Sequence, residues 1–193
     1  MWSNPRSGAE ATSAHVETAQ APRLEIQVWD AVVRLFHWSV VVGCALNFAV
    51  FTDGKAAHRW IGYGVALALA IRLVWGFVGS PYARFAQFAP RPAALAAYLR
   101  ALAQGREPRF IGHNPAGAAM MLGLMAMLVG VSLTGWLLTL DRYFGSETLE
   151  FWHEALANGL LAMIGLHVAA VLIESWRHGE NLVRSMITGR KRA

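Results

Sequence analysis

Charged residues are scarce in this chain. They make up 15% of its 193 residues, against about a quarter in a typical soluble domain, whereas 55% of the residues are hydrophobic. This balance predicts a protein that exposes apolar surface to lipid rather than to water. Cysteine is nearly absent as well. The single Cys44 excludes a disulfide framework and a cysteine-ligated iron–sulfur cluster within the chain.

The N-terminal segment lacks a long hydrophobic run. Residues 1–25 are polar and rich in Ala, Ser and Thr, which is typical of a disordered tail and unlike a secretory signal peptide. We therefore predict a tail over residues 1–25, followed by one membrane domain over residues 26–193. Insertion into the membrane is expected to depend on the first transmembrane helix.

Four apolar stretches are long enough to cross a bilayer, which takes about 20 residues in a helix. They are predicted at about residues 33–51, 59–78, 116–139 and 152–175. Asn114 followed by Pro115 is typical of a helix start and supports the third stretch. We predict an all-α integral membrane four-helix bundle with up-down-up-down topology and no strand between its spans. Residues 93–103 are expected to form either a short interfacial helix or an ordinary linker.

Lysine and arginine are distributed unevenly among the segments outside the spans. The tail, the connection after the second span and the C-terminus hold most of them, whereas the other two loops hold only Lys55, Arg59 and Arg142. Because basic loops stay on the cytoplasmic side, both termini are predicted to be cytoplasmic. This topology accounts for the net charge of +5, and no nucleic-acid partner is expected.

Four of the seven histidines lie within or at the ends of the apolar stretches: His37, His58, His153 and His167. The 14 residues from His153 to His167 correspond to about 21 Å of helix and nearly four full turns, so both share one face at two depths. In the predicted topology His58 and His153 lie at the outer level. His37 and His167 lie at the inner level, nearer the termini.

Two histidines on facing helices at one depth suit a flat cofactor held from both sides, and imidazole is a common axial ligand of haem iron. Zinc is less suitable because it needs about four ligands at one point. Two alternatives stay open at this stage. A membrane histidine can serve as a polar contact between helices, and a small transporter could use the four histidines as a proton relay.

Three further residues are candidates for cofactor binding. Arg72 lies inside the second span, 14 residues after His58, and we expect it to bind a haem propionate or, less readily, a quinone oxygen. Arg34 can be interpreted in the same way but lies nearer the interface, and both side chains could instead reach the headgroups. His113 could contact a quinone headgroup or a propionate, or be an ordinary interfacial histidine.

Six segments resemble one known family. They are VWDAVVRLFHW (28–38), AAHRWIGYG (56–64), RLVWGFVGSPYARF (72–85), GHNPAGA (112–118), FWHE (151–154) and GLHVAA (165–170). In this order they resemble the bacterial cytochrome b561 family, which includes the b-type cytochrome subunits of nickel-iron hydrogenases. The resemblance covers about residues 25–190. It implies two b-type haems with His37, His58, His153 and His167 as axial ligands of the iron.

The resemblance also implies electron transfer in the bacterial inner membrane between a quinone pool and a redox partner. Three roles are compatible with it. The chain could work with a c-type cytochrome, serve as the membrane anchor and electron conduit of a hydrogenase or another dehydrogenase, or act alone as a quinone oxidoreductase on a small molecule.

Overall fold

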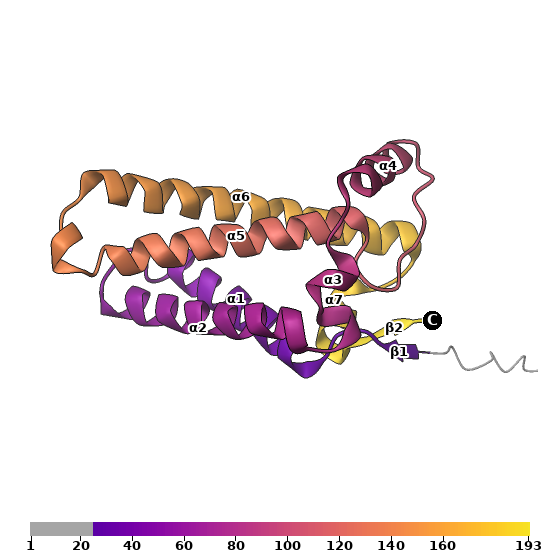
Figure 1. The fold of residues 1–193 in the computed structure, drawn as a ribbon, viewed down its shortest axis with the longest axis horizontal. Coiled ribbons are helices and arrows are strands. Elements are labelled where there is room, and N and C mark those ends of the chain that lie inside the picture. The colour runs from indigo at the N-terminus through magenta and orange to yellow at the C-terminus, as the bar shows by residue number, and fades with distance from the viewer. Residues whose placement is uncertain (1–24) are drawn as a thin grey trace, which may run out of the picture.

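The structure is a computed structural model that describes residues 25–193. The predicted tail therefore lies outside the described residues, except for Glu25. Four long helices dominate the fold and run alternately in opposite directions (Figure 1). They are α1 (Ala31–Ala49), α2 (Ala56–Val78), α5 (Pro115–Leu137) and α6 (Glu147–His178). The predicted all-α membrane bundle is confirmed.

Short elements connect the long helices and gather mainly at the end where the described chain begins and ends (Figure 1). The sequence left it open whether residues 93–103 form a helix or a linker, and the structure shows that they belong to a helix. The short elements are η1 (Pro81–Ala83), α3 (Phe85–Phe88), α4 (Pro92–Ala103), η2 (Asp141–Tyr143), α7 (Leu182–Thr188), β1 (Glu25–Gln27) and β2 (Arg190–Arg192).

The fourth long helix extends well beyond its predicted ends at residues 152 and 175. Its 32 residues correspond to about 48 Å, against a hydrocarbon core of about 30 Å. Hydropathy in the sequence detects only the apolar middle of this helix. Its first turn contains Glu147 and Glu150, which lie outside that apolar stretch. Such acidic residues are favourable near a helix N-terminus. Gly179 ends the helix in the left-handed conformation, with φ 57°.

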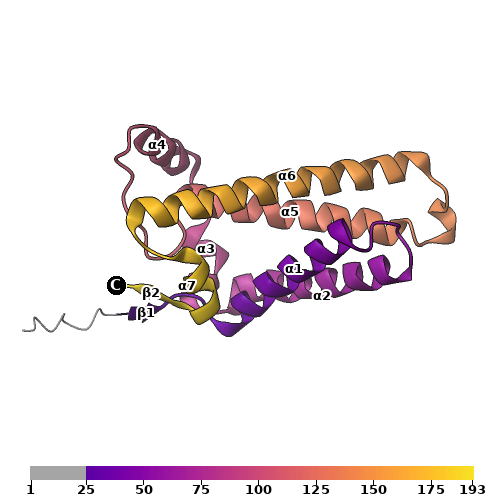
Figure 2. The same ribbon diagram turned by 180° about the vertical axis from the view of Figure 1, so that it is seen from behind.

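The helices pack in the order α1, α2, α5 and α6, each mainly against the next (Figure 2). A buried cluster joins all four in the middle of the bundle: Cys44, Val65, Leu69, Met125, Leu128 and Leu160. Many other large apolar side chains of the four helices face outward, and only 6% to 17% of the residues in the most apolar stretch of each helix are buried. Surfaces of this kind are stable only in lipid, so the chain is a multi-pass membrane protein.

Asp30 links the start of α1 to the end of α2. One carboxylate oxygen caps α1 by accepting a hydrogen bond from the Val33 amide at 2.9 Å. The other oxygen accepts hydrogen bonds from Trp75 Nε1 at 2.9 Å and Ser80 Oγ at 2.5 Å. Burial acts to raise the pKa of Asp30, but the hydrogen bonds from Ser80, Trp75 and Val33 outweigh it and lower the pKa.

We expect Asp30→Ala to destabilise the bundle by about 2 kcal/mol, because it removes a helix cap and leaves the Trp75 and Ser80 donors unpaired. In a chain of this size, that loss lowers the unfolding midpoint by roughly 4–8 °C. Thermal unfolding of the detergent-purified protein measures it. An Asp30→Ala midpoint within error of wild type would contradict this role of the carboxylate.

The charge of Asp30 makes a separate, pH-dependent contribution. Because its folded pKa is lowered, the stabilisation is complete above the unfolded value of 3.8 and is lost as the pH falls through the folded pKa. Asp30→Asn keeps a side-chain cap but no charge. The unfolding midpoint of Asp30→Asn should therefore fall less than that of wild type when the pH is lowered from 6 to 3.

Candidate functional site

His58 and His153, the predicted outer pair, lie close together. His58 is in the first turn of α2 and His153 is in the second turn of α6. Their ring centres are 6.3 Å apart, with an angle of 72° between the ring planes. Both line a cavity of about 260 Å³ whose other walls are mainly apolar and include Gly43, Gly62 and Gly135.

Hydrogen bonds determine which ring nitrogen carries the proton in each of these histidines. The Nδ1 atom of His58 lies 2.8 Å from the Phe51 carbonyl oxygen, which can only accept, so Nδ1 is the donor. The Nδ1 atom of His153 lies 2.9 Å from Thr134 Oγ1, and that hydroxyl donates to the Gly130 carbonyl at 2.8 Å. Thr134 therefore accepts from His153. Each neutral ring then keeps a free lone pair on Nε2.

The separation of the two rings is compatible with a metal held between two imidazoles. Two metal–nitrogen bonds of about 2 Å each, with roughly 1 Å from each nitrogen to its ring centre, predict a separation of about 6 Å. The observed separation is 6.3 Å. Haem iron fits this donor set because the porphyrin supplies its remaining ligands, whereas zinc would need two more donors from the protein.

His37 and His167, the predicted inner pair, are not brought into ring contact. His37 is in α1 and its ring contacts the neighbouring Trp38, with centres 5.1 Å apart. The physical reason is the packing order, because α1 and α6 are not among the helix pairs that pack closely. Within the described part of the chain, His37 Nδ1 is buried and has no hydrogen-bond partner.

Several buried nitrogen atoms near the inner level lack partners among the described residues. They are Arg34 Nε, His37 Nδ1, Arg72 Nη1 and His113 Nδ1. Arg72 is only 1% exposed, and its other terminal nitrogen donates to the Ala83 carbonyl at 3.1 Å. Leaving such donors unpaired in a low-dielectric interior is costly. An acceptor such as a carboxylate supplied by a ligand fits this end of the bundle.

The guanidinium group of Arg34 is less available than that of Arg72 to bind a ligand. Its Nη1 atom donates to the Ile187 carbonyl of α7 at 2.6 Å, so the side chain holds the C-terminal segment against α1. One nitrogen, Nε, is left without a partner. Arg34 therefore has a structural role that the sequence did not indicate, and only part of its guanidinium group could face a ligand.

His113 is partly buried, and its Nδ1 atom is fully enclosed. Its ring packs against Trp29 and Phe88, with centres 4.7 Å away in both cases. Burial lowers its pKa to about 4, and the positive charges of Arg72 and Lys191 act in the same direction. His113 is therefore neutral at physiological pH and can offer one donor and one acceptor.

Two residues near the sites were missed by sequence reasoning. Thr134 lies in the apolar run of α5, where a threonine gives no signal of a contact with histidine. Lys191 was counted among the basic residues of the C-terminus, yet it is only 7% exposed and donates to the Phe110 carbonyl at 3.2 Å. Its burial depends on the pairing of β2 with β1, which no local pattern predicts.

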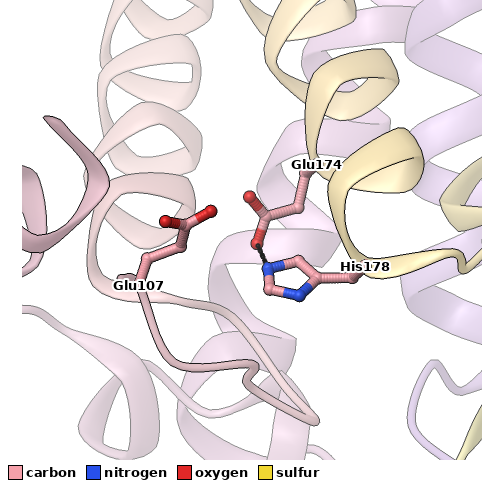
Figure 3. A group of neighbouring side chains, drawn as sticks. All are labelled: Glu107, Glu174 and His178. Atoms are coloured by element: carbon pink, nitrogen blue, oxygen red, sulfur yellow. Dashed lines mark ion pairs between the residues drawn. The ribbon is translucent and has the colours of Figure 1, made fainter. Parts of the chain in front are cut away.

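A third cluster at the same end contains Glu107, Glu174 and His178, whose possible ligand atoms all lie within 4.8 Å of one another (Figure 3). Arg177 already binds Glu107 with two hydrogen bonds, of 2.5 and 2.7 Å. Glu174 accepts from Asn114 at 3.0 Å and pairs with His178 at 3.3 Å. Because Arg177 provides the positive charge that a cation would bring, we interpret this cluster as an ion-pair network.

Comparisons with known proteins identify the family of this chain. The model of the prokaryotic cytochrome b561 family matches residues 28–189. The chain is also 25% identical, over 97% of its own length and 94% of the relative's, to a protein named probable Ni/Fe-hydrogenase B-type cytochrome subunit from Bradyrhizobium diazoefficiens. No solved structure matches the chain.

The family match spans all four long helices and includes all four candidate histidines. A b-type cytochrome requires haem-ligating side chains inside its bundle, and the outer pair has a suitable arrangement. The chain belongs to the prokaryotic cytochrome b561 family.

Proposed function

We propose that this b-type cytochrome binds two haems and transfers electrons across the bacterial inner membrane between a quinone and a redox partner protein. The observation that carries the proposal is the outer pair, with its two free Nε2 lone pairs and a ring separation of 6.3 Å. Haem b, when bound, supplies one-electron redox chemistry. His58 and His153 would hold the outer haem, and His37 and His167 the inner one.

The remaining residues of the two sites would position the haems and set their environment. Apolar walls around His58 and His153 exclude water. At the inner level Arg72 would donate to a propionate through its unpaired Nη1, with the unpaired Nε of Arg34 as a second donor. A quinone oxygen is the alternative partner for Arg72.

His113 is our candidate for contact with the quinone headgroup. Its ring is neutral and partly buried, and its Nδ1 atom has no partner among the described residues. A neutral imidazole can donate to or accept from a quinone oxygen, and it can exchange a proton when that oxygen changes redox state. A haem propionate is the alternative partner for His113.

For the redox partner we favour a hydrogenase or another dehydrogenase, anchored by this chain at the end opposite the termini. The named relative supports a hydrogenase. Large aromatic side chains are exposed at that end, including Trp60, Phe144 and Trp152. The second candidate function is electron transfer with a c-type cytochrome as partner, or action of the chain alone as a quinone oxidoreductase. We place both termini in the cytoplasm from the distribution of basic residues.

The geometry does not favour a transporter that relays protons along its histidines. Such a relay needs a chain of polar groups between the two levels. The apolar cluster that includes Val65, Leu128 and Leu160 occupies the middle of the bundle instead.

We expect about two haems per chain in the wild type and about one in His153→Ala and in His167→Ala, each variant losing a different haem. The physical reason is that each variant would leave the iron of one haem with a single axial histidine instead of two. Haem quantitation against protein, with absorption spectra of the reduced minus oxidised forms, measures this. His178→Ala is the control and should keep both haems.

Two outcomes would contradict the dihaem assignment. A wild-type protein without a Soret and α-band signal would exclude haem binding. Identical spectra of His153→Ala and His167→Ala, with the same single haem missing, would exclude the two-level arrangement.

Arg72→Gln should lower the midpoint potential of the inner haem. Removing a buried positive charge disfavours the added electron, and a tenfold change in the relative stability of the two oxidation states corresponds to about 60 mV for one electron. A redox titration monitored at the α-band measures the shift. Arg106→Gln, at an exposed position outside the four long helices, is the control. Equal shifts in both variants would argue against a contact between Arg72 and the inner haem.

His113→Leu should slow haem reduction by a quinol about tenfold or more, because it removes a hydrogen-bonding and proton-exchanging group from the proposed headgroup contact. Stopped-flow mixing with a short-chain quinol measures the rate. Haem content and reduction by dithionite should stay as in wild type. A quinol rate equal to wild type would place the quinone elsewhere.

A further inference from the structure

We propose that Thr134 and Gly135 of α5 are positioning residues for His153 and set the potential of the outer haem. This inference rests on the proposed haem binding and extends it to α5, the one long helix without a histidine. Thr134 would hold the imidazole by a hydrogen bond, and Gly135 would leave room for the ring beside it.

The other contacts of the Thr134 hydroxyl give its hydrogen bond with His153 a direction. The hydroxyl lies 2.8 Å from the Gly130 carbonyl and 3.1 Å from the Val131 carbonyl, both of which can only accept. With its single proton donated to the Gly130 carbonyl, a lone pair of Oγ1 faces His153 Nδ1 at 2.9 Å. The ring is held as the Nδ1–H tautomer, which leaves Nε2 free for iron.

Gly135 controls the position of the same ring by its lack of a side chain. A Cβ atom at this position would lie 3.0 Å from His153 Cε1 and 3.5 Å from Nδ1. Such a contact is tighter than ordinary van der Waals packing, so an alanine would push the ring away from α5. Adjacent residues thus determine the orientation and the position of His153.

The two outer histidines differ in the kind of partner that their Nδ1 atoms have. His58 donates to the Phe51 backbone carbonyl, which no substitution removes, whereas His153 donates to a side chain. A hydrogen bond from Nδ1–H makes the imidazole a stronger electron donor, which stabilises ferric haem and lowers its potential. Thr134 is therefore the position at which a change of side chain adjusts the outer haem.

The test compares the potentials of both haems in purified full-length variants. Thr134→Val keeps the shape of the side chain without the hydroxyl, and Thr134→Ser keeps the hydroxyl. Thr139→Val is the matched control, because Thr139 hydrogen-bonds Trp136 and Tyr63 and has no hydrogen bond with a histidine among the described residues. The His167→Ala background isolates the outer haem for the titration.

We expect Thr134→Val to raise the midpoint potential of the outer haem alone and to change the electron paramagnetic resonance signal of its ferric form. Thr134→Ser and Thr139→Val should match wild type. Loss of the outer haem in Thr134→Val, restored in Thr134→Ser, would also support the role, since a lost partner of a ligating histidine lowers metal affinity about 10- to 100-fold. Gly135→Ala should perturb the same haem.

Full haem content with unchanged potentials and spectra in Thr134→Val would overturn the proposal while leaving haem binding intact. Equal effects of Thr134→Val and Thr139→Val would also overturn it. If the valine variant does not accumulate in membranes, Thr134→Ala compared with Thr134→Ser gives the same test. A wild-type protein without haem would instead refute the proposed function itself.

Discussion

The arrangement of this bundle depends on one constraint, which is that a polar group inside the hydrocarbon layer must find its hydrogen-bond partner within the protein or its ligand. At the outer level the constraint is met for both Nδ1 atoms of the histidine pair. The Nε2 lone pairs are left free, on rings whose centres are 6.3 Å apart. The buried Asn47 Oδ1 also lacks a partner among the described residues, and Asn47 lines the same cavity, so the unmet hydrogen-bonding capacity of the outer level lies where a cofactor would bind.

The inner level meets the same constraint much less completely. Its buried nitrogen atoms include Arg72 Nη1, His37 Nδ1 and His113 Nδ1, and none of these atoms has a partner among the described residues. The two candidate ligands lie on α1 and α6, which do not pack closely. We infer that the protein alone holds the outer site in shape, whereas the inner site depends more strongly on its ligand. Binding free energy at the inner site would then contribute to the stability of the bundle.

Periodicity explains what the sequence could predict. A spacing of 14 residues on a helix places His153 and His167 on one face without any knowledge of tertiary structure. Apolar runs likewise locate the four spans, because a membrane helix must be mainly apolar over the part that lies in the hydrocarbon core. Asn114 was recognised as the cap of α5 because the Asn-Pro pair is a local signal, and its side chain accepts from the Gly117 amide.

Features that depend on contacts between distant segments were not predictable in this way. The strands β1 and β2 are three residues long, too short to show an alternating pattern, and they join the two ends of the described chain. Lys191 is buried only because of that pairing. Thr134 touches His153 through the packing of α5 on α6, and a threonine within an apolar helix carries no local sign of that contact.

Basic residues at the end with the termini have two successive roles in this fold. During insertion their unpaired charge determines which side of the membrane they stay on. In the folded chain several become structural: Arg177 pairs with Glu107, and Arg109 pairs with Glu180. Burial lowers the pKa of Lys191, although the nearby Glu180 acts to raise it. Counting charges in the sequence therefore overstates the positive charge that the folded surface offers to lipid or to a partner.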